Sequence, residues 1–279
     1  MHAKNEYYFS LGLIISLMET KRCLICMDLD GSLLLPDGSL SSYAEETLRL
    51  LEKKGHLVVL CSGRPLRSIL PYYKQAGLHG PIIADNGASL YFQESEEYRY
   101  SPEMVEEVFH KAQEAIFSFM AEGDKTIYLD KPDPVLAKYF PFKGMEVKSL
   151  EEGAKVEESC HTLLFGVKEG KGDILKEIAS AYPGVGYRSW HGVPYGEFYF
   201  LTGGKGDRLK EIQARNHIEF ADIYAFGDSD NDTGMLFSAG HPYAMKNAKS
   251  PYLKSLFPLS EKSNAEDGVA YELRKIFSL

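Results

Sequence analysis

The sequence lacks the features that mark several specialised classes of protein. It has no dense run of lysine and arginine: 31 Lys and Arg stand against 40 Asp and Glu, for a formal net charge of −9. Nucleic acids and anionic membranes bind concentrated positive charge, so neither is expected as a partner. The chain also contains no internal repeat or low-complexity tract, and its 279 residues favour two globular domains over one.

Cysteine is scarce, with only four in the chain. Cys23 and Cys26 form a C-x-x-C pair, a spacing that zinc sites and redox sites use. Residues three apart on a strand point to opposite faces, however, and no second cysteine or histidine pair stands at ligand spacing. We therefore expect buried thiols in a reducing compartment, which favours a cytoplasmic protein.

Long apolar segments are absent as well. The longest candidate, "YYFSLGLIISLM" at residues 7–18, is shorter than the roughly 20 residues of a membrane helix. One lysine precedes it and no small-residue cleavage site follows it, so a signal peptide is not favoured. We expect Met18 to be the natural start and residues 1–17 to be an N-terminal extension that is a candidate for disorder.

What is present is an alternation of strands and helices. The apolar run "RCLICM" predicts a strand, and a helix follows at about residues 42–54, where Ser42 and Glu45 have capping-box spacing. "HLVVLCSG", "PLRSILPYYKQAG" and "PIIADNG" then predict strand, helix and strand. The turn signal "PDGS" predicts a small hairpin within residues 31–41. This order is typical of an α/β fold with a Rossmann-like, doubly wound parallel sheet.

The alternation changes within residues 89–190, where short alternating segments lie beside helices predicted at residues 102–121 and 172–181. We interpret this part as an inserted α+β domain, between core segments at residues 18–88 and 191–279. The α/β rhythm returns with "EFYFLTGG", a helix from Lys205, the strand "DIYAFGD", a helix from about Asn231 and a closing helix at residues 268–277.

Polar residues stand where the predicted core strands end. Ligands of a parallel α/β sheet bind outside the carboxyl ends of its strands, so these residues are the candidate site. Taken singly, each is more often a turn or cap residue; together they occur in the order acid pair, hydroxyl, lysine, acid pair. They are Asp28 and Asp30, Ser62 and Gly63, Lys205, then Asp228, Asn231 and Asp232.

The acid pairs carry the chemical prediction. Carboxylates about 4 Å apart repel by several kcal/mol at an effective dielectric near 20, and a divalent cation removes that cost. Oxygen ligands beside a phosphate favour Mg²⁺. Asp28 is then the candidate nucleophile towards a phosphoryl group, and Asp30 the general acid and base. Ser62, the amide of Gly63 and Lys205 would hold the phosphoryl oxygens, while Asp228 completes the metal shell and Asp232 orients it.

Six motifs, in order, carry a family resemblance: "DLDGSLL", "CSGRP", "NGA", "GGKGDRL", "FGDSDNDTGML" and "MKNA". Over residues 22–88 and 195–278 the chain resembles the Cof-type branch of the haloacid dehalogenase-like phosphatases. The resemblance implies a Rossmann-like core, magnesium, a phosphoaspartate intermediate and a mobile α+β cap between the hydroxyl and lysine motifs. Ser32 and Ser62 stand where threonine is commoner, and Lys246 replaces a usual glycine.

The same resemblance implies roles for the matching residues. Asp28 is implied as nucleophile and metal ligand, and Asp30 as general acid/base and backbone metal ligand. Ser62 and Lys205 would bind the phosphate and Asp228 the metal, while Asn231 and Asp232 complete the last motif.

Four further residues leave open readings. Arg64 either reaches substrate or cap or forms an ion pair, and Trp190, His191 and Tyr195 either line the pocket or pack at the domain junction. We expect a magnesium-dependent phosphatase, a monomer or homodimer, acting on a small phosphorylated metabolite such as a sugar phosphate or nucleotide. A phosphomutase and a phosphometabolite-binding regulator are the alternatives.

Overall fold

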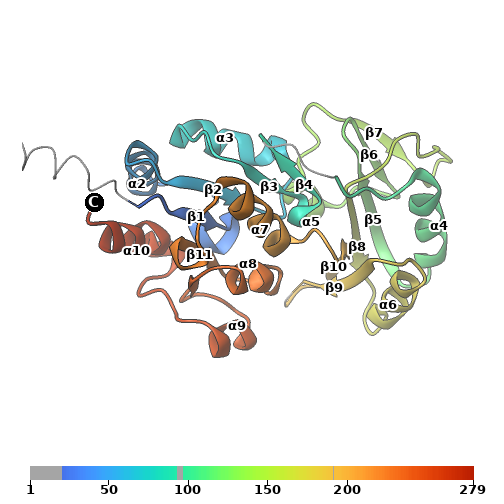
Figure 1. Cartoon of the computed structure of the whole chain (residues 1–279). Coiled ribbons are helices and arrows are strands. Elements are labelled where there is room, and N and C mark those ends of the chain that lie inside the picture. Colours follow the sequence, from blue (N-terminus) through green and yellow to red (C-terminus); the bar gives the residue numbers. More distant parts are fainter. Residues whose placement is uncertain (1–20, 93–96, 191) are drawn as a thin grey trace, which may run out of the picture.

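The structure is a computed structural model that describes residues 21–92, 97–190 and 192–279. The predicted extension at residues 1–17 and His191 lie outside the described residues. The described chain forms a core and a cap, each built on its own six-stranded sheet (Figure 1).

The core sheet confirms the predicted doubly wound α/β fold. Its strand order is β12-β11-β1-β2-β3-β4, and every neighbouring pair is parallel except β3 and β4. The central strands are buried along their whole length, which is why they read as continuous apolar runs. The strands are β1 (Leu24–Met27), β2 (Leu57–Cys61), β3 (Ile82–Ala84), β4 (Ser89–Tyr91), β11 (Ile223–Gly227) and β12 (His241–Ala244).

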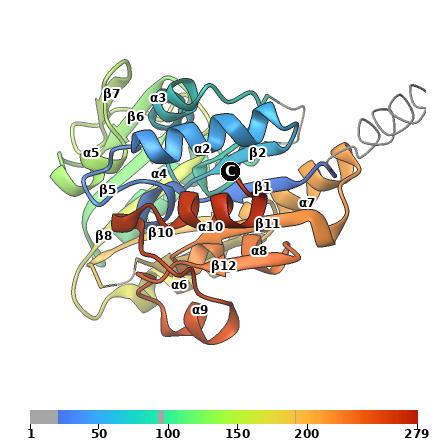
Figure 2. The same ribbon diagram turned by 90° about the vertical axis from the view of Figure 1, so that its left-hand side faces the viewer.

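Helices cover both faces of the core sheet and make two hydrophobic layers. One layer holds α2 (Ser42–Lys53), α3 (Leu66–Ala76) and α10 (Gly268–Phe277), with α10 beside α2 (Figure 2). The other holds α7 (Lys205–Asn216), α8 (Thr233–Phe237) and α9 (Pro251–Leu256). Cys23 packs in the first layer and Cys26 in the second, so this pair lies on opposite faces as predicted.

The cap sheet has the order β7-β6-β5-β8-β10-β9, with every neighbouring pair antiparallel except β6 and β7. One face packs on α4 (Pro102–Ala112) and α6 (Gly172–Ser180), and the other on α5 (Pro134–Tyr139). The cap strands are β5 (Ile116–Glu122), β6 (Thr126–Leu129), β7 (Glu146–Ser149), β8 (Thr162–Val167), β9 (Val185–Ser189) and β10 (Tyr195–Phe200).

Three local predictions were wrong. The helix predicted at residues 102–121 ends at Ala112, because the apolar residues after it pair with β6 and β8 as β5. The hairpin predicted within residues 31–41 is a turn without strands, since Leu33 and Leu34 are buried under the core helices instead of pairing across it. The N-cap of α2 is Ser41, whose Oγ accepts the N–H of Ala44 at 3.0 Å, and not Ser42.

The change from one sheet to the other comes later along the chain than the predicted domain boundaries at residues 89 and 190. β4 begins at Ser89 and still belongs to the core sheet. β10, predicted as the return to the core, pairs with β8 and β9 in the cap. Both strands are short alternating segments, so their patterns fit either sheet, and only long-range pairing assigns them.

All four cysteines are free and buried, as the sequence analysis expected. Within the described residues no helix is both long and apolar enough to cross a membrane.

Candidate active site between core and cap

The turn after β1 separates the two aspartates that the sequence places one residue apart. Asp28 continues the sheet, donating its N–H to the carbonyl of Phe226 at 2.9 Å. The chain then tightens over Leu29–Leu33, where Gly31 has a φ of +77° that favours glycine. The turn therefore begins directly after Asp28, so that Asp28 and Asp30 do not share one strand face although they stand two positions apart in the sequence.

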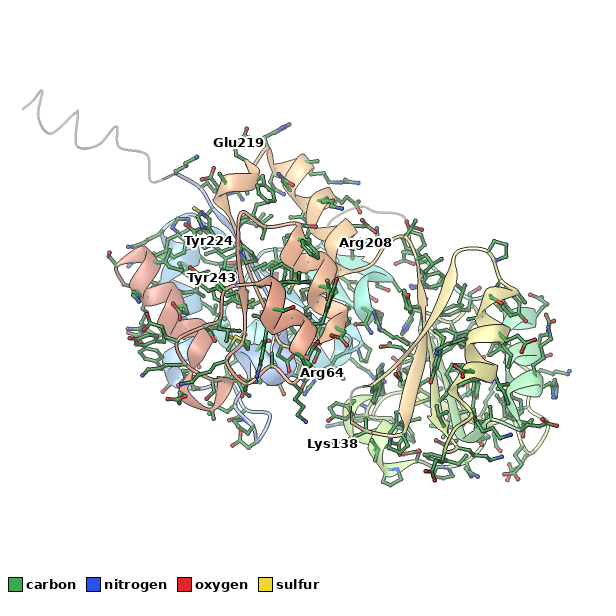
Figure 3. The ribbon with its side chains drawn as sticks, turned by 90° about the horizontal axis from the view of Figure 1, so that it is seen from below. Arg64, Lys138, Arg208, Glu219, Tyr224 and Tyr243 are labelled. Carbon is green, nitrogen blue, oxygen red and sulfur yellow. The ribbon has the colours of Figure 1, made fainter. Side chains whose placement is uncertain are left out.

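Asp30 instead faces Arg64. Both of its carboxylate oxygens accept hydrogen bonds from the guanidinium group, each at 2.6 Å. Figure 3 shows Arg64 at the side of the core that faces the cap. The Asp30 side chain remains 40% exposed, so the pair lies at the rim of the site. The structure thus shows the ion pair, and because Arg64 also lines the cavity described below, contact with the substrate stays a prediction.

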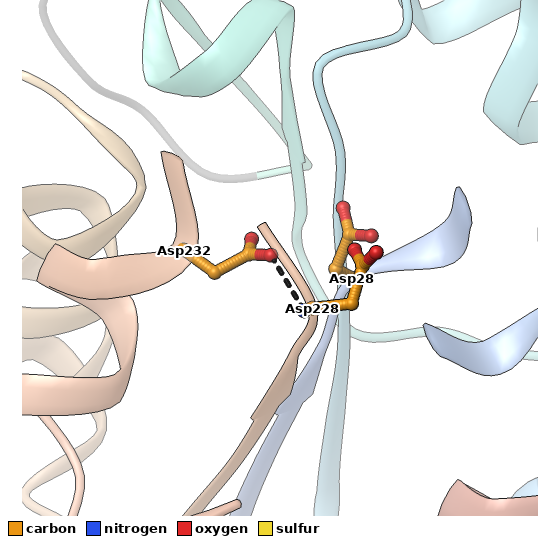
Figure 4. A group of neighbouring side chains, drawn as sticks. All are labelled: Asp28, Asp228 and Asp232. Carbon is orange, nitrogen blue, oxygen red and sulfur yellow. Dashed lines mark hydrogen bonds between the residues drawn. The ribbon is translucent and has the colours of Figure 1, made fainter. Parts of the chain in front are cut away.

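Asp28, Asp228 and Asp232 lie close together at the carboxyl ends of β1 and β11. Each offers a carboxylate oxygen, and these atoms all lie within 4.8 Å of one another. Figure 4 shows Asp28 and Asp228 side by side, with Asp232 directed at the backbone of Asp228. Gly31 permits this approach, because a Cβ there would stand 2.4 Å from Oδ2 of Asp228.

Lys205, the first residue of α7, completes this group. Its Nζ donates to Oδ1 of Asp28 and to Oδ1 of Asp232, both at 2.7 Å, and the residue is only 2% exposed. Burial opposes its charge, but the carboxylates of Asp232 and Asp28 outweigh burial and hold the pKa of Lys205 well above its ordinary value. We call Asp28, Asp228, Asp232 and Lys205 the acidic floor.

The floor has more negative charge than Lys205 balances. Burial raises the pKa of Asp28 well above its ordinary range, with Lys205 offsetting part of the effect. Burial and the neighbouring Asp232 raise the pKa of Asp228 to about 7. A divalent cation would relieve both groups, and a donor set made only of carboxylate oxygens fits Mg²⁺.

Asp232 differs from its two partners because its oxygens are already occupied. Oδ2 accepts the backbone N–H groups of Asp228 and Ser229 at 3.0 and 3.1 Å, and Oδ1 accepts from Lys205. These bonds fix the loop that carries Asp228. The geometry suits a residue that orients the site, and the carboxylates of Asp28 and Asp228 are the better candidates for direct metal contact.

The hydroxyl motif lies beside the floor, at the end of β2. Ser62 is buried, and its Oγ accepts the N–H of Arg64 at 3.1 Å. A Cβ at Gly63 would stand 3.0 Å from the side chain of Asn86, so glycine allows the two loops to approach. Asn86 in turn accepts a hydrogen bond from Nδ2 of Asn231 at 2.9 Å. The structure therefore brings the predicted core motifs together around one point.

The cap covers the side of the site that lies opposite the acidic floor. A cavity of about 220 Å³ is lined by floor residues on one side and by cap residues on the other. We call the cap residues that the following argument uses the cap wall: Tyr139, Phe140, Arg188, Trp190 and Glu197. Trp190 thus lines the pocket, whereas Tyr195 packs beneath it, with ring centroids 5.8 Å apart.

Sequence reasoning missed three residues of one hydrogen-bonded group that reaches from core to cap: Asn86, Glu197 and Arg188. Asn86 donates from Nδ2 to Glu197 at 2.7 Å, and Glu197 also accepts from Nε of Arg188 at 2.8 Å. A signal existed for Glu197, because a carboxylate inside the apolar run "YGEFYF" needs a buried partner. Asn86 lies in the "NGA" motif, yet the spacing alone assigned it no role.

Comparisons with known proteins agree with this arrangement. The family model described as haloacid dehalogenase-like hydrolase matches residues 25–273. The 5-amino-6-(5-phospho-D-ribitylamino)uracil phosphatase YitU of Bacillus subtilis is 30% identical over 94% of this chain and 100% of its own length. The HMP-PP phosphatase of Serratia proteamaculans is 26% identical over 84% of this chain and 87% of its own. A haloacid dehalogenase-like hydrolase from Bacteroides thetaiotaomicron shares the fold, with a TM-score of 0.76, 24% identity and coverage of 92% and 100%.

Proposed function

We propose a specific reaction on one premise: this chain belongs to the Cof-type branch of the haloacid dehalogenase-like hydrolases, and it is a phosphatase. The reaction is magnesium-dependent hydrolysis of a small phosphorylated metabolite through a phosphoaspartate on Asp28. One observation carries it. Asp28 lies buried at the floor of a cavity shared by core and cap, between Lys205 and Asp228.

The first step forms the covalent intermediate. A carboxylate oxygen of Asp28 attacks phosphorus, the bond from phosphorus to the ester oxygen breaks, and Asp30 gives a proton to the leaving oxygen. Lys205, the hydroxyl of Ser62 and the N–H of Gly63 hold the phosphoryl oxygens while charge develops on them.

The second step returns the enzyme to its starting state. Asp30 removes a proton from a water molecule, whose oxygen attacks phosphorus and releases inorganic phosphate and the free carboxylate of Asp28. Both oxygens of Asp30 accept hydrogen bonds from Arg64, which fits the ionised form that Asp30 has between the two steps, so we assign Arg64 to positioning Asp30 as the base. Asn231 supports the site from the last loop through Asn86.

Magnesium would be held by Asp28, Asp228 and the backbone carbonyl of Asp30, with Asp232 orienting the Asp228 loop. When bound, it supplies positive charge against the phosphoryl oxygens and the floor carboxylates. The excess negative charge of the acidic floor supports this assignment.

The substrate class rests on the cavity and on the relatives. By their names, two relatives act on 5-amino-6-(5-phospho-D-ribitylamino)uracil and on HMP-PP, both small phosphorylated compounds. A cavity of about 220 Å³ suits a ligand of that kind and not a macromolecule. We extend the proposal to sugar phosphates and nucleotide-like compounds.

The test is release of inorganic phosphate from sugar phosphates, nucleotides, pyridoxal phosphate and flavin mononucleotide, with no bisphosphate activator present. We expect turnover of at least one ester with Mg²⁺, loss on chelation, recovery with Mg²⁺ and little recovery with Ca²⁺, whose looser coordination would misplace Asp28. The Asp28→Asn variant controls for contaminating phosphatases.

Three results would contradict the proposal in different ways. Full activity after exhaustive chelation would exclude the metal. Phosphoryl transfer only in the presence of a bisphosphate would identify a phosphomutase. Tight binding without turnover across the whole panel would identify a regulator.

A further inference from the structure

The cap wall satisfies most of its own polar groups, which limits what it recognises. Glu197 is buried and accepts three hydrogen bonds: from Nε of Arg188 at 2.8 Å, from Nε1 of Trp190 at 3.3 Å and from Asn86 at 2.7 Å. A carboxylate has about four acceptor sites, so little of its capacity remains. A sugar whose hydroxyls need several open donors and acceptors is poorly matched to this wall.

What the wall does offer the cavity is aromatic surface. Tyr139, Phe140 and Trp190 all line it. The Trp190 ring is held edge-to-face against Tyr139, with centroids 6.0 Å apart at 84°, and by its bond to Glu197. An aromatic side chain already held in one orientation binds a flat ring without losing further rotamer freedom.

Arg188 adds a donor whose charge is already compensated. It is the cross-strand partner of Glu197, and its guanidinium carbon lies 4.8 Å from the ring centroid of Tyr199. Its Nη2 is buried without a hydrogen-bond partner among the described residues. Because Glu197 neutralises the guanidinium group, a neutral carbonyl oxygen suits this donor better than a second phosphate does.

From these contacts we propose that the cap wall is a subsite for a planar, carbonyl-bearing ring on the leaving group of the substrate. The ring lies against Trp190 and its carbonyl oxygen accepts a hydrogen bond from Arg188. Asn86 joins this subsite to the catalytic loops, since it bonds Glu197 on one side and Asn231 on the other. The inference rests on the proposed function, and it selects nucleotide-like esters over simple sugar phosphates.

Three phosphate esters that share a ribose 5-phosphate group separate the contribution of the ring from that of its carbonyl groups. UMP carries a ring with carbonyl groups, AMP carries a ring without one, and ribose 5-phosphate carries no ring. For the wild-type protein we expect kcat/KM for UMP to exceed that for ribose 5-phosphate by about tenfold or more. A ratio at or below one would overturn the ring subsite.

Two variants test the two contacts. In Trp190→Leu, kcat/KM for UMP should fall to within about threefold of kcat/KM for ribose 5-phosphate. The same ratio of kcat/KM values in Trp190→Phe should lie between those of Trp190→Leu and the wild type. Arg188→Met should lower kcat/KM for UMP by about tenfold and for AMP much less, because only uracil has the carbonyl oxygen. Val147→Ala, on the exposed strand β7, is the matched control and should leave every ratio as it was. Equal losses for all three esters in both variants would contradict the assignment.

A binding measurement gives a readout that does not depend on turnover. Trp190 is the only tryptophan of the chain, so its fluorescence reports on the wall directly. In the Asp28→Asn protein with Mg²⁺, UMP should change the emission saturably and ribose 5-phosphate should change it little. Equal changes with both ligands would refute the subsite.

The two proposals fail separately. If phosphate is released with no preference for a ring, the subsite is wrong and the phosphatase stands. If no ester in the panel releases phosphate, the proposed function fails and the subsite fails with it.

Discussion

The acidic floor and the cap wall face one cavity, and they treat charge differently. In the floor, two buried carboxylates and the half-buried one of Asp228 share one lysine, and burial raises the pKa values of Asp28 and Asp228. In the wall, one buried carboxylate, Glu197, meets three donors, one of them a guanidinium group. The floor therefore needs positive charge from outside, such as a metal ion, whereas among the buried polar atoms described for the wall only Nη2 of Arg188 lacks a hydrogen-bond partner.

This difference separates chemistry from selection. Unbalanced charge at a buried site is costly unless it stabilises something that arrives there, which is what catalysis of phosphoryl transfer requires. A wall whose polar groups are mostly hydrogen-bonded to one another presents shape and aromatic surface, which suit recognition. Changes in the floor should lower the turnover of every substrate, and changes in the wall should alter the ranking among substrates.

The largest expected effect is on turnover, and it comes from substitution of the two aspartates that follow β1 in the floor and at its rim. Asp28→Asn removes the nucleophile and should reduce turnover by roughly 10⁴-fold or more, with no covalent adduct. Asp30→Asn keeps the nucleophile but loses the group that activates water. With p-nitrophenyl phosphate, whose leaving group needs little protonation, a phosphoryl adduct should accumulate.

Rapid quench followed by intact-mass measurement detects the adduct, and mild hydroxylamine should remove it as expected for an acyl-phosphate. An adduct on the Asp28 variant but none on the Asp30 variant would mean that the roles are reversed or the mechanism is not covalent. Turnover in both without any adduct would favour direct attack by water.

An intermediate effect concerns the charge balance of the floor. Lys205→Met leaves Asp28 and Asp232 without their cation, so the free energy of unfolding should fall by about 3–5 kcal/mol and turnover by roughly 10²-fold or more. The matched control is Lys210→Met on the same helix, whose side chain is 62% exposed. Denaturant unfolding and steady-state kinetics measure the two effects. Equal free energies of unfolding for the two variants would show that Lys205 does not stabilise the carboxylates of the floor.

The smallest effect lies outside floor and wall, where core meets cap. His161 of the cap is buried, with Nδ1 3.2 Å from Asp85 of the core and Nε2 3.9 Å from Glu122. Arg67 of the core also bonds Glu122. Burial lowers the pKa of His161, but Asp85 and Glu122 more than offset burial, so that the pKa is raised above its ordinary value near 6.5.

The raised pKa of His161 determines how folding stability depends on pH. A raised folded-state pKa contributes stability that is fully present below about pH 6.5 and is lost as the pH rises through the folded-state value. The melting temperature of the wild type should therefore fall over that window, on the order of a few °C, more than that of His161→Gln. His79→Gln, at a histidine that is 86% exposed, is the control. If the melting temperatures of wild type and His161→Gln change in parallel with pH, protonation of His161 does not stabilise the contact between core and cap.

Part of the fold and the site was predictable because its signals are local or topological. Buried parallel strands are apolar along their whole length, and ligands bind at the carboxyl ends of such strands, so the sequence alone identifies the candidate residues. The closing helix was predicted at residues 268–277, the bounds that α10 has. Local signals failed where pairing decided the outcome, as at β5, where an amphipathic helix and a buried strand share the same apolar residues.

The sequence by itself determined the doubly wound core and the motifs that form the acidic floor. Those motifs lie at strand ends and in short turns, which local sequence patterns predict. Tertiary structure alone decided that Asp30 turns to Arg64 and that Asn86, Glu197 and Arg188 form one chain of hydrogen bonds. The physical reason is distance along the chain. Asn86 and Glu197 are bonded across 111 positions, and their meeting depends on how the cap packs on the core, which no local pattern encodes.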